Sequence, residues 1–385
     1  MRAGIWQEFD GYDEIIAEIE TARKQGHAYT PDQVGVNAFV ERLHPSRLKL
    51  RVIDIITETV STKTFRLAAA RGALPPFQAG QYIALYLQID GIRTSRPYSI
   101  SSSPCQTEYW DVTVRRVADG LVSNYLLDEV AVGMALESSG PQGVFHFNPL
   151  YHMPNLVAIA GGSGITPFMS MLREIVDRNL AREVILFYGN QTTDDIIFHA
   201  ELEQLSQRFK QIKYFPVIES PPEDYVGSRG YISSDLLLGV CGDVWDKTFF
   251  LCGPKGLYDF CLPELEAIGV NRNRVRREMY GTPVHIWEYP GWPADIKGED
   301  SFQLTVNDGA PITAQAGQSL LVTLEKNGIV PPSVCRSGEC SMCRMQIKSG
   351  KVFQPAGVAV RKSDRQNGYV HACVSYPLTD LSIKL

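Results

Sequence analysis

The hydrophobic pattern at the start of the chain is helical. Residues 13–25 bring isoleucines to one face of a helix, and a second apolar stretch at 36–43 follows a proline. This spacing predicts two short helices. We expect residues 1–48 to form a helical N-terminal extension that packs on the main body, and docking of a partner is the alternative interpretation.

From residue 48 to about residue 150 the pattern is that of strands. Four β-rich runs are separated by Pro and Gly, and they span 48–59, 63–69, 82–89 and 109–117. Runs of this length and spacing predict an antiparallel β-barrel or sandwich. We place this predicted domain at residues 49–150.

Strand and helix patterns then alternate. Strand patterns lie at 155–160, 183–189, 212–219 and 247–253, and helix patterns lie at 167–178, 199–209 and 255–269. This alternation predicts an α/β domain with a doubly wound parallel sheet, which we place at residues 151–281. Residues 282–299 are rich in Pro, Gly and Trp and predict a linker. A last unit follows at residues 300–385.

Composition excludes several classes of protein. A chain of 385 residues with 44% hydrophobic side chains is expected to form two or three domains and not to be disordered. No apolar run approaches the ~18 residues that a membrane span needs. The net charge of −6 argues against nucleic acid as a partner. Acidic residues stand near the start, where a signal peptide needs an apolar core, so we predict a cytoplasmic protein.

Four of the eight cysteines have a spacing that indicates an iron–sulfur cluster. Cys335, Cys340 and Cys343 lie on one short loop, and Cys373 lies in a later segment. This C-x4-C-x2-C…C spacing is the plant-type ligand pattern of a [2Fe–2S] cluster. A zinc site is the alternative, but zinc units usually repeat C-x2-C pairs. We therefore predict that these four thiolates hold a [2Fe–2S] cluster.

An Arg-Pro-Tyr-Ser tetrapeptide in the predicted barrel has side chains suited to a flavin. Arg96 can form a fork to a diphosphate, the Tyr98 ring can lie on an isoalloxazine, and the Ser99 hydroxyl can reach a ring nitrogen. Gly120 and Ser123 open a predicted helix. We expect Ser123 to cap this helix, whose N-terminus would then favour a phosphate.

A glycine-rich turn and a Cys-Gly-Pro tripeptide indicate a dinucleotide site. The turn, residues 161–167, lies between a predicted buried strand and a helix, where glycine permits close approach of a ligand. We expect Thr166 to be the N-cap of that helix and Pro167 its first residue. The tripeptide at 252–254 ends another predicted strand. Ligands of doubly wound sheets bind at the carboxyl ends of strands, where both segments fall.

With these motifs together, residues 48–385 resemble the ferredoxin–NADP reductase superfamily. They are most similar to iron–sulfur flavoprotein reductases that serve aromatic-ring and steroid oxygenases. The resemblance implies a multidomain fold. It consists of an antiparallel β-barrel flavin domain, an α/β doubly wound nucleotide domain and an α+β (β-grasp) ferredoxin domain, preceded here by the short helical extension.

The resemblance also implies which residues contact each cofactor. Those expected near the flavin are Tyr82, Arg96, Pro97, Tyr98, Ser99, Val114, Arg115, Arg116, Gly120, Val122, Ser123 and Tyr280. Those expected near the dinucleotide are Gly162, Ser163, Gly164, Ile165, Thr166, Cys252, Gly253 and Pro254. Ser99, Thr166, Cys252 and Glu278 are expected to frame the path of the hydride, with Glu278 passing a proton.

Two departures bear on the choice of cofactors. Glu219 and Ser220 stand where relatives that use NADPH often carry Ser-Arg, and Gln191 replaces an arginine. A carboxylate repels a 2′-phosphate but accepts hydrogen bonds from a ribose diol. We therefore predict that Glu219 favours NADH over NADPH. The Asp-Gly-Leu-Val-Ser sequence at 119–123 is similar to that of FAD-binding relatives, so FAD is predicted and FMN is the second choice.

The resemblance implies a reductase that passes electrons from NADH through FAD and a [2Fe–2S] cluster to a protein acceptor. A terminal oxygenase or demethylase is the expected acceptor. Two other functions stay open at this point. One is the reductive activation of another metalloprotein of hybrid-cluster or corrinoid type, and the other is electron carriage without catalysis.

Charge is distributed unevenly along the chain. Residues 301–385 hold nine Lys and Arg against five Asp and Glu, although the whole chain is acidic. Arg336 and Arg344 flank the cysteine loop. We expect a basic collar where electrons leave and an acidic docking patch on the partner. A solvated surface without a steering role is the alternative.

Overall fold

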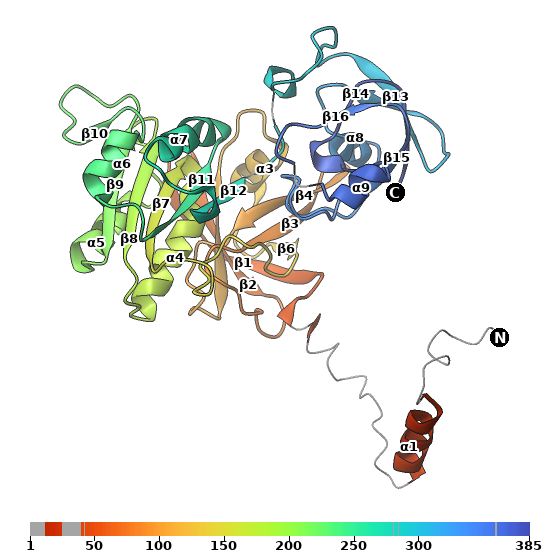
Figure 1. The fold of residues 1–385 in the computed structure, drawn as a ribbon, viewed down its shortest axis with the longest axis horizontal. Coiled ribbons are helices and arrows are strands. Elements are labelled where there is room, and N and C mark those ends of the chain that lie inside the picture. The colour runs from red at the N-terminus through yellow and green to blue at the C-terminus, as the bar shows by residue number, and fades with distance from the viewer. Residues whose placement is uncertain (1–11, 25–39, 42, 280, 284, 359) are drawn as a thin grey trace. The chain divides into compact units, whose positions relative to one another are not determined.

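The computed structural model describes residues 12–24, 40–41, 43–279, 281–283, 285–358 and 360–385. The chain divides into two units, residues 1–45 and residues 46–385 (Figure 1). In the first unit, helix α1 (Tyr12–Lys24) confirms the first predicted helix, and Ile16 and Ile19 on it are exposed. Part of the second predicted helix lies outside the described residues, and packing of this extension on the main body stays a prediction.

The second unit begins with an antiparallel sheet of six strands in the order β4-β3-β6-β1-β2-β5. Its strands are β1 (Leu48–Thr59), β2 (Thr62–Ala69), β3 (Tyr82–Ile89), β4 (Ile92–Ser99), β5 (Tyr109–Arg115) and β6 (Ala135–Ser138). A bridge between Ile100 and Val112 joins the residue after β4 to β5. Helix α3 (Leu121–Glu129) buries Leu126 and Leu127 in the core of this sheet beside Trp110. The predicted antiparallel strands are confirmed.

A parallel sheet of six strands follows, in the order β10-β9-β8-β7-β11-β12. Its strands are β7 (Asn155–Gly161), β8 (Val184–Asn190), β9 (Ile212–Ile218), β10 (Ser228–Arg229), β11 (Lys247–Gly253) and β12 (Val275–Met279). Its helices are η2 (Gly162–Ile165), α4 (Thr166–Asp177), α5 (His199–Arg208), α6 (Ser234–Cys241), α7 (Lys255–Ala267) and η3 (Arg272–Arg274).

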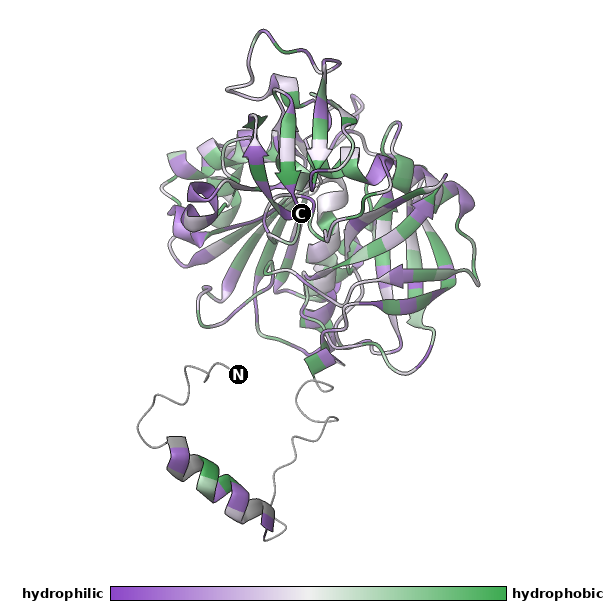
Figure 2. Cartoon of the chain, turned by 90° about the vertical axis from the view of Figure 1, so that its right-hand side faces the viewer, coloured by the Kyte–Doolittle hydropathy of each residue, from purple (hydrophilic) through white to green (hydrophobic). Residues whose placement is uncertain are grey.

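Helices cover both faces of the parallel sheet, as predicted. Alternate strand residues point to opposite sides, so Ala158 packs in the core that holds α4 and α5, whereas Val157 packs in the core that holds α6 and α7. The strands are therefore apolar on both faces, which is typical of parallel sheets. Figure 2 shows this as hydrophobic bands along the strands. No helix among the described residues is long and apolar enough to cross a membrane.

The last part of the chain forms a mixed sheet in the order β14-β13-β19-β15-β17. Its strands are β13 (Ser301–Val306), β14 (Ile312–Gln315), β15 (Arg344–Ser349), β17 (Tyr369–His371) and β19 (Leu381–Lys384), beside a small pair β16 (Val352–Phe353) and β18 (Tyr376–Pro377). Its helices are α8 (Leu320–Lys326), α9 (Lys362–Gln366) and η5 (Ala372–Val374). The predicted linker contains η4 (Ile286–Glu288), and Ile286 is buried against Phe353 and Tyr376. This segment is therefore packed on the mixed-sheet part.

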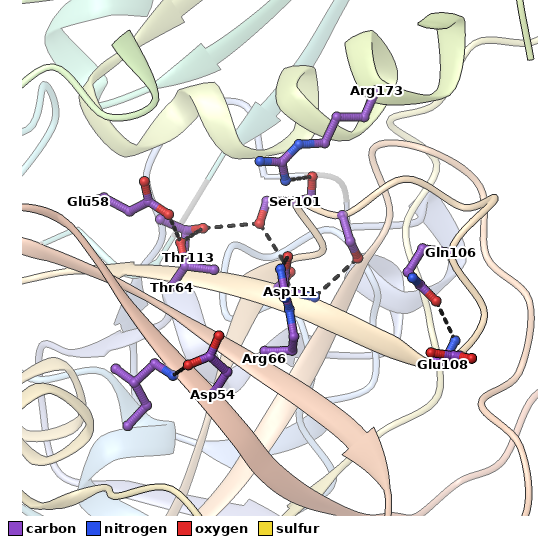
Figure 3. Close-up of polar contacts among 12 residues, drawn as sticks. Asp54, Glu58, Thr64, Arg66, Ser101, Gln106, Glu108, Asp111, Thr113 and Arg173 are labelled. Carbon is purple, nitrogen blue, oxygen red and sulfur yellow. Dashed lines mark hydrogen bonds and ion pairs between the residues drawn. The ribbon is translucent and has the colours of Figure 1, made fainter. Parts of the chain in front are cut away.

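Hydrogen bonds join the antiparallel sheet to helix α4. Arg173 on α4 donates to the carbonyl of Ser101 at 2.8 Å and forms a fork with the carboxylate of Glu201. Ser170 donates to the carbonyl of Ser102 at 2.7 Å. Figure 3 shows Arg173 above Ser101, whose hydroxyl also contacts Thr113 on β5. These bonds fix the two sheets against each other.

Candidate functional site

The four predicted cluster ligands lie together. The cluster loop, residues 335–343, brings backbone N–H groups of Ser337 and Cys340 to the Cys335 sulfur at 3.5 and 3.3 Å. Cys373 on η5 hydrogen-bonds with the thiols of Cys335 and Cys343. Hydrogen bonds from Cys340 and Cys373 hold the pKa of Cys335 below its ordinary value. Four thiols on two segments thus share one small volume.

The cluster loop also fits a group with sulfur acceptors. The hydroxyl of Ser337 is buried and has no hydrogen-bond partner among the described residues. Gly338 has a φ of +84°, which favours glycine, and His371 contacts its carbonyl at 2.7 Å. No group of three or more His, Cys, Asp or Glu in the described chain is arranged for a single metal ion. A [2Fe–2S] centre instead takes two thiolates on each of two irons.

Strand β4 presents the side chains predicted to hold a flavin. Arg96 donates to the Thr94 hydroxyl at 2.8 Å and to the Ser95 carbonyl at 2.7 Å. Among the described residues, no carboxylate forms an ion pair with Arg96. Burial and the nearby charge of Arg336 lower the pKa of Arg96 to about 10. A half-buried guanidinium without a carboxylate partner fits an anionic diphosphate.

The other predicted flavin residues have varied surroundings. Ser99 is buried and pairs in register with Tyr82 on β3, and Tyr98 lies at the edge of the sheet core.

The expectation that Ser123 caps α3 was wrong. Gly120 is the N-cap, and Ser123 lies within the first turn, where its hydroxyl accepts from the N–H of Val117 at 3.1 Å.

The three side chains at the end of β5 point to different places. Val114 belongs to the core of the antiparallel sheet. Arg115 pairs with Asp195, which follows β8, and Arg116 pairs with Asp128 on α3. Burial opposes ionisation of Asp195, but hydrogen bonds from Thr59 and Ser61 and the charge of Arg115 keep its pKa below the ordinary value. Arg115 therefore links the two sheets, and its contact with a flavin stays a prediction.

A cavity of about 850 Å³ opens at the carboxyl ends of the parallel strands. Of the residues predicted for the nucleotide, Gly162, Glu219 and Pro254 line it, together with Arg115, which was predicted for the flavin. Tyr231 and Phe260 also line it and were not predicted from the sequence. The other predicted nucleotide residues are not part of its lining: Ser163, Gly164, Ile165, Thr166, Cys252 and Gly253. The carboxylate of Glu219 accepts a hydrogen bond from the Tyr231 hydroxyl at 2.7 Å. The volume suits a ligand of nucleotide size.

The glycine-rich turn packs directly on the Cys-Gly-Pro segment. A Cβ on Gly164 would lie 2.0 Å from the carbonyl oxygen of Cys252, so a larger residue would force the two segments apart. Thr166 is the first residue of α4 rather than its N-cap, because η2 precedes the helix directly, and Pro167 is the second residue. The Thr166 hydroxyl donates to the carbonyl of Ser163 at 3.0 Å.

Cys252 and Glu278 are neighbours in the sheet. They pair in register between β11 and β12, and both are buried. Tyr258 joins the two strands, because its hydroxyl accepts from the N–H of Gly253 and donates to the carbonyl of Glu278. Sequence reasoning missed Tyr258, although its place in the first turn of the helix after Pro254 was a usable signal.

The three predicted sites meet around Tyr82. Tyr82 and Ala84 on β3 form a buried cluster with Val334 and Cys335 of the mixed-sheet part. Burial and the negative charges of Cys335 and Glu278 raise the pKa of Tyr82. Burial and Glu339 likewise raise the pKa of Glu278. Predicted flavin, nucleotide and cluster residues are thus close enough to interact electrostatically, while Tyr280 lies outside the described residues.

The predicted basic collar is wrong for Arg336. Its side chain is 1% exposed and forms an ion pair with Glu325 on α8 at 2.7 Å. Sequence spacing could not show this, because Glu325 lies in a separate helix. Arg344 is exposed, but it pairs with Asp364 at 3.1 Å and lies over the ring of Tyr369.

Comparison with known proteins gives three family matches. Residues 47–147 match an oxidoreductase FAD-binding domain, residues 158–262 an oxidoreductase NAD-binding domain, and residues 304–378 a 2Fe-2S iron-sulfur cluster binding domain.

Two relatives match over most of their length. The glycine betaine monooxygenase reductase subunit of Chromohalobacter salexigens is 30% identical over 88% of this chain and 95% of its own. The NADH oxidoreductase HCR of Escherichia coli (strain K12) is 30% identical over 80% of this chain and 88% of its own.

A solved structure shows the same fold. It is phthalate dioxygenase reductase, described as a modular structure for electron transfer from pyridine nucleotides to [2Fe–2S]. It aligns with a TM-score of 0.66 at 22% identity, over 88% of this chain and 98% of its own. Together, the residues at the three sites and these matches show that the chain belongs to the ferredoxin–NADP reductase superfamily, as an iron–sulfur flavoprotein reductase with sites for FAD, NAD and a [2Fe–2S] cluster.

Proposed function

We propose that this reductase takes electrons from NADH and delivers them to a terminal oxygenase or demethylase. The observation that carries the proposal is the match to the glycine betaine monooxygenase reductase subunit, which spans nearly all of both chains. The ferredoxin reductase component of a Rhodococcus rhodochrous 3-ketosteroid-9-alpha-monooxygenase and a stachydrine N-demethylase reductase subunit of Rhizobium meliloti are 29% and 26% identical. These relatives differ in substrate, so the acceptor class is proposed and the substrate is left open.

The residues at the three sites support this electron path. When bound, the cofactors supply a two-electron hydride transfer and then single-electron transfers, and the protein supplies binding and orientation. Arg96 would hold the flavin diphosphate, and Ser99 and Thr166 would position the reacting rings. Buried Cys252 would shape the nicotinamide pocket. Glu278, whose pKa burial raises, would hold a proton on its carboxyl group and pass it on.

The nucleotide cavity supports a preference for NADH. Glu219 lines it, and the hydrogen bond from Tyr231 fixes its carboxylate there. A carboxylate in this place accepts hydrogen bonds from a ribose diol and repels a 2′-phosphate. We therefore propose that Glu219 selects against NADPH.

We also propose the finer domain architecture. The bridge between Ile100 and Val112 supports closure of the antiparallel sheet into a barrel, and α8 packed on the mixed sheet supports a β-grasp ferredoxin fold. The proposed domains are residues 49–150, 151–281 and 300–385, with the extension at 1–48 and the linker at 282–299.

Reconstitution tests the proposed acceptor. The holoprotein and NADH are mixed with the purified terminal component of each of the three systems whose reductases are named above, and product formation is measured against NADH consumption. Coupled turnover with one of them is expected, and a Cys343→Ser variant should give none. Cytochrome c reduction by NADH without turnover of any oxygenase would contradict the proposal.

The second candidate is reductive activation of another metalloprotein. The 30% identity to an NADH oxidoreductase that is not named as an oxygenase component favours it. An affinity pull-down from the native host with the reduced holoprotein separates the two, because it recovers an oxygenase in one case and a different metalloprotein in the other.

A further inference from the structure

A buried ion pair lies between the cluster loop and helix α8. Arg336 of the loop donates from its two terminal nitrogens to both carboxylate oxygens of Glu325, each at 2.7 Å. The two residues are 2% and 3% exposed. A buried pair of this kind loses the hydration of both charges, so it is stable only when its remaining hydrogen bonds are completed by the protein.

Strand β4 completes those hydrogen bonds. The Thr94 hydroxyl donates to Glu325 at 3.0 Å, and Arg336 donates to the carbonyl of Ser95 at 3.0 Å. The hydroxyls of Ser95 and Ser333 lie 3.3 Å apart, and all these groups are buried. The ion pair of the mixed-sheet part therefore depends on the strand that carries the flavin motif.

The same strand holds Arg96. Arg96 donates to the Thr94 hydroxyl and the Ser95 carbonyl, and Arg336 approaches the same two oxygens at 3.4 and 3.0 Å. The two guanidinium groups thus share two uncharged acceptors, and only Arg336 has a carboxylate partner, which leaves the positive charge of Arg96 uncompensated. That charge favours the anionic diphosphate of the flavin. The flavin site and the cluster loop are consequently joined by shared acceptors.

Elsewhere the contact between β3 and the cluster loop is apolar. Tyr82, Ala84 and Val334 pack against Cys335, but apolar packing is not directional and tolerates small shifts. The ion pair is directional and lies one residue from Cys335. Arg336 also has a φ of +55°, a conformation that residues other than glycine adopt rarely, so the side-chain contacts hold the loop in a strained shape.

We propose that Glu325 and Arg336 are positioning residues for electron transfer from the flavin to the cluster. The pair, closed by Thr94 and Ser95, fixes the cluster loop on the flavin strand at one distance and orientation. This inference goes beyond the proposed function, because it concerns transfer inside the chain and does not depend on the acceptor.

Rapid mixing of the holoprotein with NADH tests the proposal without any external acceptor. Flavin and cluster reduction are followed at separate wavelengths in Glu325→Gln, Thr94→Val and the control Arg365→Gln, which removes an exposed charge of the same part. Flavin reduction is expected to stay within about twofold of the parent in Glu325→Gln and Arg365→Gln. Thr94→Val also removes an acceptor of Arg96, so its cluster reduction is compared with its own flavin reduction in FAD-saturated protein. Cluster reduction should slow by about tenfold in the first two variants and not in the control, because small misplacements of reacting groups cost factors of this size.

Two further measurements separate positioning from general destabilisation. Hydrogen exchange of the backbone amides in β4 and the cluster loop should increase in both variants. The dissociation constant for FAD should not rise in Glu325→Gln, since removal of a carboxylate makes the surroundings of Arg96 more positive. A destabilised protein would instead bind FAD more weakly, and that result would overturn the proposal.

Thr94→Val provides a second test in case Glu325→Gln does not fold correctly. It removes the hydroxyl on β4 but leaves the ion pair within the mixed-sheet part intact. If Glu325→Gln loses its cluster, Thr94→Val alone decides the question. Parent-like cluster reduction and exchange in Thr94→Val, or equal slowing in Arg365→Gln, would overturn the proposal whatever the identity of the acceptor.

Discussion

The antiparallel sheet makes two interfaces of different character. Towards the parallel sheet, the side chains of Arg115 and Asp195 are 30% and 16% exposed, and Arg173 and Glu201 also reach solvent. Towards the mixed sheet, the side chains of Arg336 and Glu325 are 1% and 4% exposed. Partly exposed pairs are screened by salt and contribute little, whereas breaking a buried pair leaves an unpaired charge.

This difference follows what each interface has to accommodate. On the proposed assignment, a nicotinamide dinucleotide enters and leaves the cavity beside Arg115, so contacts that can rearrange in water suit that side. A [2Fe–2S] cluster stays bound, and the electron path to it depends on a fixed distance. A buried and directional contact suits that side.

Cys343→Ser removes a predicted cluster ligand and should stop electron transfer to the mixed-sheet part without affecting the nucleotide side. Cys343 hydrogen-bonds with Cys373, and clusters of this type are held by thiolates, which serine does not supply. We expect loss of the cluster and of electron transfer beyond the flavin, with flavin reduction by NADH retained. Iron content, cluster absorbance and stopped-flow flavin reduction check this. A folded variant without flavin reduction would show that the two interfaces are not independent.

Glu219 and Ser220 should determine the preference for NADH over NADPH without any contribution from the interface with the mixed sheet. Replacing the two residues with Ser-Arg removes the repulsive carboxylate and adds a partner for a 2′-phosphate. The ratio of kcat/KM for NADH to that for NADPH should fall at least about tenfold, since one charge contact is worth a factor of this order. Glu223→Gln, a nearby exposed charge, is the control. An unchanged ratio would show that Glu219 does not determine the nucleotide preference.

The sequence predicted best what is local along the chain. Cys335, Cys340 and Cys343 lie on one loop, so their spacing alone indicated the cluster. The alternating strand and helix patterns likewise predicted the parallel sheet, because the hydrophobic spacing of each strand or helix can be seen within its own segment.

Contacts between distant segments were beyond the sequence. Arg336 looked like a surface charge because its partner Glu325 is in another helix and Thr94 in another sheet. Asp195 has no motif around it, although it joins the parallel sheet to the antiparallel sheet. Tyr258 follows the Cys-Gly-Pro motif, but that position does not reveal its contact with Glu278 on another strand. Single-sequence patterns report whether a residue suits burial or exposure, and not which distant group compensates a charge.

Asp195→Asn tests the cost of breaking the more exposed interface. Asp195 accepts from Thr59, Ser61 and Arg115, so we expect the free energy of unfolding to fall by about 1–2 kcal/mol. Asp128→Asn, which breaks a solvent-exposed pair with Arg116, should lower the free energy of unfolding by less than Asp195→Asn does. Glu325→Ala should cost more than either, about 3–5 kcal/mol, because it leaves Arg336 buried and unpaired.

The effect of Asp195 should also depend on pH. Its pKa is below the ordinary value in the folded protein, so its contribution is present above the unfolded pKa. The difference in free energy of unfolding between the parent and Asp195→Asn should be largest near neutral pH. It should shrink as the pH falls below about 4. Denaturant unfolding at several pH values measures this. A difference that does not change with pH would mean that the ionised carboxylate is not the stabilising group.

The smallest effect is expected at Arg344, which stands outside both interfaces. It is the exposed arginine beside the cluster loop, but Asp364 and the ring of Tyr369 hold its guanidinium, so little free charge remains to steer a partner. Arg344→Glu should slow electron transfer to the oxygenase partner by about twofold at low salt, and the difference should vanish where the screening length falls to about 8 Å, near 0.15 M. Lys348→Glu on the same strand is the control for net charge, and flavin reduction by NADH should not change in either variant. Transfer rates that stay flat from low to high salt in parent and variants would discard electrostatic steering and the acidic patch on the partner.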